Sequence, residues 1–180
     1  MHKDMFFYYV FALVMSYTLL LPAMVRFTDR IYSYAPNGSL IALAFYIVGF
    51  LCKALSVFIM LYMWHISRGM NLNEPSLSEI KLSEYVEFMQ GSIGSIGTLI
   101  LCISALIYAV ILRKLSPVTT ILFFTGAVLS FVCDIDGNII PLNVHNLIAV
   151  SVVIVFGLAY ISMGTYLGRQ GDVGRQGDVG

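Results

Sequence analysis

Two charged residues stand out in this sequence because they lie in or beside long apolar segments, where charge is rare. Lys53 interrupts a run of apolar residues that extends from residue 40 to residue 64, and Asp134 follows directly after another run, 118–133. A charge held away from water is costly unless a partner compensates it, so such residues are often functional. Lys53 is therefore the first candidate for a functional side chain.

The two charges are expected to lie at similar depth and to form a pair. The run 118–133 is short, about 24 Å as a helix, which draws Asp134 inwards towards the level of Lys53. The pair has three interpretations: it fixes the register of two helices, it binds a proton, an ion or an anionic ligand, or Lys53 is neutral among hydroxyl groups. Helical spacing puts Tyr46, Gly49 and Ser56 on the same stripe as Lys53, and this stripe is expected to face inwards.

A second group of residues could bind a metal or a cofactor. His65 and His145 lie near the ends of two apolar segments on the same predicted side, with Asp134 and Asp136 close to them. Two histidines and two carboxylates can ligate zinc or another transition metal, and two facing histidines can hold haem b. The spacing is not fixed by any motif, so an ordinary polar border between apolar helices and water remains the simpler interpretation.

The chain contains five apolar segments that can each form a long helix and so position these residues. Their approximate ranges are 5–25, 40–64, 93–112, 118–133 and 147–167. About 20 apolar residues are needed to cross the hydrocarbon of a bilayer, and in lipid such segments must be helical. The sequence therefore predicts an all-α, polytopic integral membrane bundle of about five transmembrane helices, with residues 1–167 forming a single membrane domain.

Two segments fall outside this pattern. The polar stretch 68–90 is expected to form either a short helix lying flat on the membrane surface or a solvated loop. Residues 168–180 repeat Gly-Arg-Gln-Gly-Asp-Val, which predicts a flexible, glycine-rich tail.

The third apolar segment begins with a run of small residues. Their spacing gives small-xxx-small pairs, which let the backbones of membrane helices approach closely. The residues concerned are Gly91, Gly94, Ser95, Gly97 and Thr98. The close packing can be within one chain or between subunits.

Composition agrees with a lipid-facing surface and excludes several classes of function. Only 11% of the 180 residues are charged and 59% are hydrophobic, whereas a soluble domain has about 25% charged residues. Ten basic residues balance ten acidic ones, so nucleic acid is not an expected partner. Nucleotide-binding glycine patterns and serine-nucleophile motifs are absent from the sequence.

The distribution of basic residues predicts the orientation of the chain. Lysine and arginine in short loops favour the cytoplasmic side. With the N-terminus outside and the C-terminus in the cytoplasm, the inner loops carry Arg26, Arg30, Arg113 and Lys114.

These observations favour a non-enzymatic membrane protein. The leading interpretation is a subunit of a larger membrane complex, or a homo-oligomeric sensor or channel, with the bilayer and other subunits or itself as partners. One alternative is a small transporter or channel with Lys53 as its ion or anion site, and another is an electron-transfer subunit with haem between His65 and His145. A membrane hydrolase with a metal at the histidines and aspartates is the remaining alternative.

Overall fold

The chain folds into five α-helices, as seen in a computed structural model that describes residues 3–69, 77–134 and 142–176. No strand occurs within these ranges. The helices are α1 (Lys3–Ile31), α2 (Pro36–Gly69), α3 (Leu77–Leu112), α4 (Pro117–Cys133) and α5 (Leu142–Gln176). The prediction of an all-α protein with five helices is thus confirmed.

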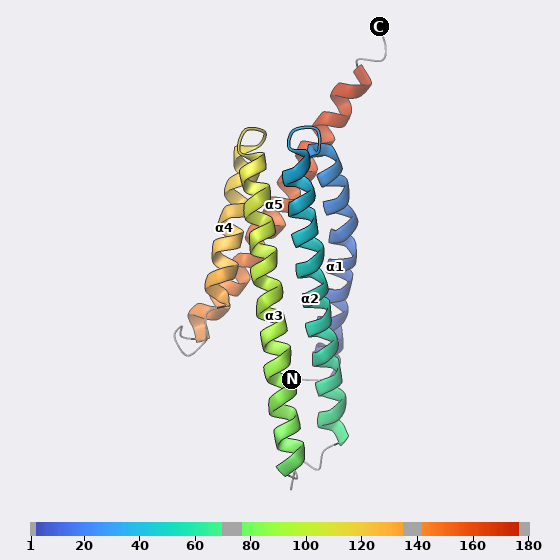
Figure 1. Cartoon of the computed structure of the whole chain (residues 1–180), viewed down its shortest axis with the longest axis vertical. Helices are drawn as coiled ribbons and strands as arrows, with labels where there is room; N and C mark the ends of the chain where they lie inside the picture. Colours follow the sequence, from blue (N-terminus) through green and yellow to red (C-terminus); the bar gives the residue numbers. More distant parts are fainter. Residues whose placement is uncertain (1–2, 70–76, 135–141, 177–180) are drawn as a thin grey trace.

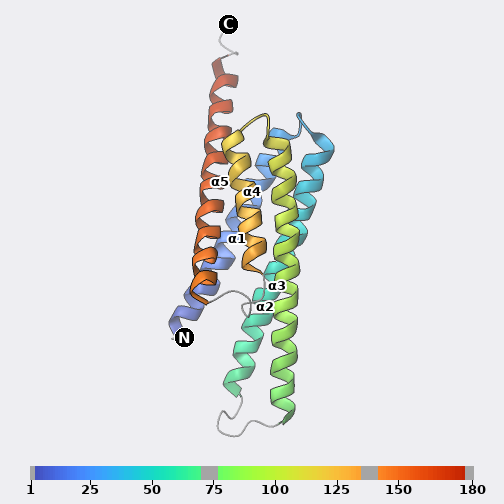
Figure 2. The same ribbon diagram turned by 90° about the vertical axis from the view of Figure 1, so that its left-hand side faces the viewer.

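The helices run alternately up and down and form a ring. Each helix packs on the next one along the chain, and α5 returns to contact α1, so the order of packing is α1–α2–α3–α4–α5–α1 (Figures 1 and 2). The contact between α1 and α5 is the smallest of the five. A ring of helices leaves space along its axis, and side chains from all five helices decide how much of that space is filled.

Length and composition mark out two of the helices. Pro36–Trp64 in α2 and Ile80–Leu112 in α3 are long and apolar enough to cross a membrane. Pro117–Cys133 and Val150–Tyr166 are shorter apolar helical segments. The outer surfaces of these helices carry many large exposed apolar side chains, including Val110 at 76% exposure and Ile121 at 64%.

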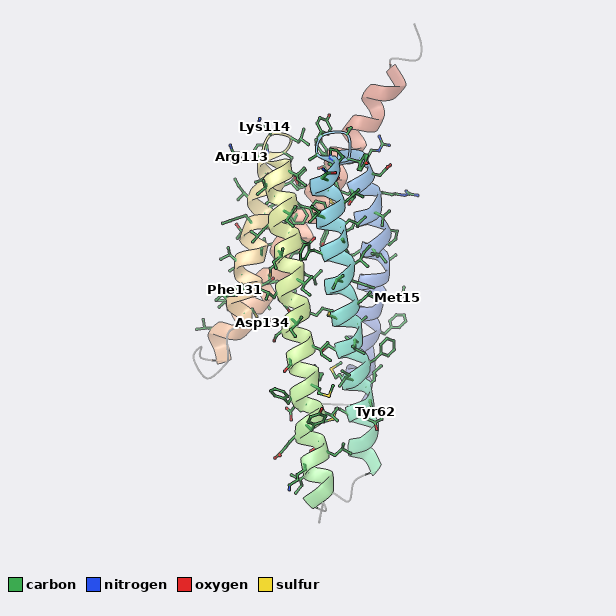
Figure 3. All side chains as sticks on the ribbon, viewed as in Figure 1. Met15, Tyr62, Arg113, Lys114, Phe131 and Asp134 are labelled. Atoms are coloured by element: carbon green, nitrogen blue, oxygen red, sulfur yellow. The ribbon has the colours of Figure 1, made fainter. Side chains whose placement is uncertain are left out.

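Helix α4 is short because both of its ends are marked in the sequence. It begins with Pro117, whose ring is tolerated in the first turn, where the backbone N–H has no helical partner. It ends at Cys133, and the backbone N–H of Asp134 donates to the carbonyl oxygens of Ser130 and Phe131 at 3.1 and 3.2 Å. Seventeen residues give a helix of about 25 Å, so Asp134 lies roughly halfway along the bundle (Figure 3).

The structure differs from the predictions for two segments that adjoin the apolar runs. Residues 77–90 form neither a separate surface helix nor a loop, because α3 begins at Leu77 and continues without a break to Leu112. Likewise α5 extends to Gln176, through most of the segment predicted to be a flexible tail. Extending an existing helix is far easier than starting a new one, so polar residues next to an apolar helix readily continue it.

The packed core lies in the half of the bundle that holds the short turns after α1 and α3. Tyr108 of α3 is fully buried there, its ring centre 5.6 Å from that of Phe27 and 6.2 Å from that of Phe123. Its hydroxyl lies 2.6 Å from Thr28 Oγ1, which itself donates to the carbonyl oxygen of Met24 at 2.8 Å. The chain Tyr108–Thr28–Met24 therefore satisfies two buried hydroxyl groups and joins α3 to α1.

Helices α2 and α3 approach each other closely at Gly49 and Gly97. A β-carbon added to Gly49 would lie 2.8 Å from Leu101 Cγ and 3.0 Å from the carbonyl oxygen of Gly97. A β-carbon on Gly97 would lie 3.0 Å from Cys52 Cβ and 3.2 Å from Lys53 Cγ. The absence of side chains at these two positions brings the stem of Lys53 directly against α3.

Candidate functional site

A cavity of about 600 Å³ lies inside the ring, and all five helices contribute to its wall. One part is apolar and aromatic, with Leu20 and Met24 from α1, Tyr108 from α3 and Phe123 from α4. Helix α5 adds Val152, Val153, Phe156, Gly157 and Tyr160. This volume is within the range of about 300–1,000 Å³ that is usual for pockets that bind small molecules.

The other part of the cavity is charged. Lys53 of α2 and Asp134 at the end of α4 both line it, and the two groups interact electrostatically. Lys53 is half-buried and Asp134 is exposed, and the structure records no direct salt bridge between these two described side chains. The cavity thus brings together the two residues predicted to pair, with space between them and an apolar chamber beside them.

The position of Lys53 within its helix follows from the stripe on which it lies. Ser56 and Tyr46, one and two turns away on the same face, are 6% and 7% exposed, and Gly49 is buried. This face of α2 is therefore turned towards the other helices, as its spacing predicts. Lys53 reaches the cavity because its neighbours on the stripe pack against α3.

Most of the other polar groups on the cavity wall are engaged in internal hydrogen bonds. Thr98 Oγ1 donates to the carbonyl oxygen of Gly94 at 3.2 Å, and Cys102 Sγ donates to that of Ala127 at 3.4 Å. Ser104 Oγ donates to the carbonyl oxygen of Ala42 at 2.8 Å. Lys53, with three N–H donors, is consequently the strongest donor that the wall presents to the interior of the cavity.

The end of α4 adds a further electrostatic feature. The last carbonyl groups of a helix carry partial negative charge, and this end of α4 lies at the same cavity as Lys53. The sequence marks where α4 stops, but the alignment of its end with Lys53 depends on how the helices pack. The Asp134 carboxyl group and the partially negative end of α4 thus line the same cavity as the Lys53 amine.

The run of small residues in α3 divides into two groups. Gly94 and Gly97 face α2: a β-carbon on Gly94 would lie 3.1 Å from Ser56 Oγ. Thr98 lines the cavity, Ser95 is exposed, and a β-carbon on Gly91 would meet nothing within 4 Å. Gly49, the partner of this run on α2, lies on the stripe of Lys53 but was not predicted as a packing residue.

The predicted histidine and aspartate group is largely outside what the structure describes. His65 belongs to α2 and His145 to α5, but their side chains and the whole of Asp136 lie outside the described residues. Helices α2 and α5 do not contact each other within the described parts of the chain. Within those parts, no group of three or more histidine, cysteine, aspartate or glutamate residues is placed to hold a metal ion.

A smaller cavity of about 360 Å³ lies between α3 and α4. Thr98, Cys102 and Asp134 line both this side cavity and the central one. The remaining wall of the side cavity is formed by Ser95, Ile96 and Leu99 of α3 and Phe131 of α4. The charged part of the central cavity is thus adjacent to an opening on the outer surface of the bundle.

No protein-family model, curated protein or solved structure matches the chain.

Proposed function

We propose that the protein is an integral membrane protein that binds a small, largely apolar solute inside its helical bundle, as a carrier or a sensor. The observation that carries this proposal is the central cavity, which combines an apolar chamber with one cation and one carboxylate. A concave, mostly apolar pocket with a few converging polar groups is the usual form of a ligand site. The proposal develops the expectation that Lys53 serves as a transporter site.

Insertion into a membrane is supported by the pattern of charge along α3. Between Glu87 and the end of the helix at Leu112 there is no charged residue, a distance of about 37 Å at 1.5 Å per residue. This length exceeds the hydrocarbon thickness of about 30 Å. Soluble proteins rarely expose large contiguous apolar patches, whereas the outward faces of α2, α4 and α5 here carry Phe58, Phe124 and Ile161 at 66%, 55% and 65% exposure.

The helical rise along α3 also places the charged site deep within the proposed bilayer. Gly97, which faces Lys53, lies ten residues after Glu87 and fifteen before Leu112, or about 15 and 22 Å from the two limits. A lysine at this depth is expensive unless it faces a cavity or a partner. The cavity and Asp134 provide both, which favours a functional role for the lysine.

The basic residues support the predicted orientation. Arg113 and Lys114 lie in the turn after α3, at the same end of the bundle as the turn after α1 (Figure 3). Arg26 and Arg30 lie in the last two turns of α1, at that end too. We propose that this end faces the cytoplasm, together with the C-terminus.

Assembly with other subunits, or with further copies of the chain, remains compatible with this function. The exposed apolar faces that suit lipid also suit neighbouring membrane helices, because both are apolar partners. The binding site itself is complete within one chain, since all five helices of that chain line it.

The experiment that tests the function is native mass spectrometry of protein extracted gently from its own membrane. Lys53→Met and Lys114→Met each remove one lysine charge, but only Lys53 lines the cavity, whereas Lys114 is exposed in a turn. We expect a bound small-molecule mass on the wild-type protein and on Lys114→Met, and its loss or depletion on Lys53→Met. A protein that remains in the soluble fraction after cell lysis, or one whose bound mass is unaffected by Lys53→Met, would contradict the proposal.

A further inference from the structure

The side cavity between α3 and α4 is a candidate route by which a ligand could reach Lys53. Its outer wall is apolar and exposed: Ile96, Leu99 and Phe131 are 53%, 47% and 55% exposed. Its inner wall is formed by Thr98, Cys102 and Asp134, which also line the central cavity. The two cavities therefore share the part of their walls that holds Asp134.

The position of this opening decides the medium from which a ligand would come. Leu99 and Ile96 flank Gly97 in the sequence, so the opening is at the level of Lys53, about 15–22 Å from the limits of the uncharged part of α3. If the bundle spans a membrane as proposed above, on which this inference rests, that level is within the hydrocarbon. The opening then faces lipid tails rather than water.

The polar groups on the wall of the central cavity indicate the chemistry of the ligand's head group. Asp134 lines both cavities, while Lys53 lines only the central one, with its stem against Gly97. Lys53 supplies three N–H donors, whereas the hydroxyl and thiol groups of Thr98, Cys102 and Ser104 on the same wall are directed to backbone carbonyls. Such a wall favours a head group that accepts hydrogen bonds and carries negative charge.

The rest of the cavity indicates the body of the ligand. Beyond Lys53 the wall consists mainly of apolar and aromatic side chains, including Met24, Phe123 and Phe156. These side chains offer a hydrocarbon chain contacts that water cannot replace. A small inorganic anion would leave this chamber without a partner.

We infer that the ligand is a membrane-dissolved amphiphile with a carboxylate head, which enters between α3 and α4 and pairs with Lys53. The carboxylate takes the place of Asp134 as the main counter-charge of Lys53. No direct salt bridge between these two described side chains has to break for this exchange. Asp134 then competes with the ligand for the lysine and limits its affinity.

Binding of dodecanoic acid, dodecanol and dodecylamine to the full chain in lipid nanodiscs tests the head group, with empty nanodiscs as the baseline. We expect the acid to bind most tightly, and Lys53→Met to weaken its binding by about tenfold or more, the size expected for loss of a charged hydrogen bond. Dodecanol should bind Lys53→Met and wild type similarly, and Lys114→Met should bind the acid as wild type does.

The outcomes separate this inference from the proposed function. Tighter binding of the amine, or acid binding that Lys53→Met leaves unchanged, overturns the carboxylate ligand but retains a binding cavity. Failure of all three compounds to bind wild type overturns the proposed function as well. If Lys53→Met does not fold, Asp134→Asn answers the same question: it should tighten binding of the acid, and weaker binding would overturn the competition between Asp134 and the ligand.

The route of entry is tested by a bulky substitution in the opening. Leu99→Trp narrows the side cavity, whereas Val110→Trp introduces the same side chain on the same helix at a position that lines neither cavity. We expect Leu99→Trp to slow the association and dissociation of the acid together, with little change in its equilibrium affinity. Equal rates in the two variants would overturn entry between α3 and α4.

Discussion

Replacing Gly49 with alanine is expected to destabilise the protein, although alanine is the better helix former. A methyl group at this position would lie 2.8 Å from Leu101 Cγ and 3.0 Å from both Leu101 N and the carbonyl oxygen of Gly97. Carbon atoms in contact are normally about 3.5–4.0 Å apart, so α2 and α3 must separate by roughly 0.5–1 Å. Two of the three neighbours are backbone atoms, which cannot rotate away as a side chain can.

The magnitude follows from two opposing terms. Overpacking of this kind costs about 1–3 kcal/mol. Alanine in place of glycine recovers about 0.5–1 kcal/mol of backbone entropy within a helix. We therefore expect Gly49→Ala to lower the free energy of unfolding by about 1 kcal/mol, and by at most about 2.5 kcal/mol.

Gly91→Ala is the matched control, because a β-carbon there meets nothing within 4 Å. It should gain the entropy term alone and be more stable than wild type by about 0.5–1 kcal/mol. Gly97→Ala, with a nearest contact of 3.0 Å to Cys52 Cβ, should fall between the two. The assay is denaturant-induced unfolding of the purified variants in the same mild detergent. A Gly49→Ala protein as stable as Gly91→Ala would refute the close approach of α2 and α3.

Two further predictions concern the core and the orientation. In the same unfolding assay, Thr28→Val should lower the free energy of unfolding by about 1–3 kcal/mol, because valine leaves the buried Tyr108 hydroxyl without its Thr28 acceptor. Tyr108→Phe should cost less, about 0.5–1.5 kcal/mol, because phenylalanine removes that hydroxyl altogether. A greater loss of stability in Tyr108→Phe than in Thr28→Val would contradict a hydrogen bond donated by the Tyr108 hydroxyl to Thr28 Oγ1. For the orientation, an epitope tag at the N-terminus should be cleaved by protease added to intact cells and a tag at the C-terminus should be protected; the opposite pattern would invert the proposed topology.

The helices were predictable from sequence to different degrees. Residues 118–133 were expected to form a helix, and α4 spans Pro117–Cys133, because Pro117 marks its start and charge follows its end. The start of α3 was missed by sixteen residues, since the search for apolar runs detects burial in lipid and not helix formation. The polar residues before Ile93 continue the same helix, and no sequence signal separates them from it.

The charged residues of the candidate site could be predicted from the sequence, but the cavity between them could not. Apolar surroundings single out Lys53, and the short fourth segment brings Asp134 to a similar level, so both residues follow from composition and helix length. The cavity between them depends on the rotation of five helices and on the close approach at Gly49 and Gly97, which spacing within one helix cannot give. The opening beside Leu99 depends on the same packing and could not be predicted.

The ring of helices also has a consequence for how the chain is made. In the described parts of the chain the extensive helix–helix interfaces join neighbours in the sequence, while the contacts of α1 with α3 at Tyr108 and of α1 with α5 are smaller. The contacts are therefore mostly local, and folds of this kind form quickly. Helices α1 to α4 can assemble one after another as they leave the ribosome. The contact of α5 with α1 is the only one that joins the two ends of the chain, and α5 supplies one side of the cavity. The binding site is therefore completed last, and a chain that ends before α5 would expose an open, apolar groove to the quality-control machinery of the cell.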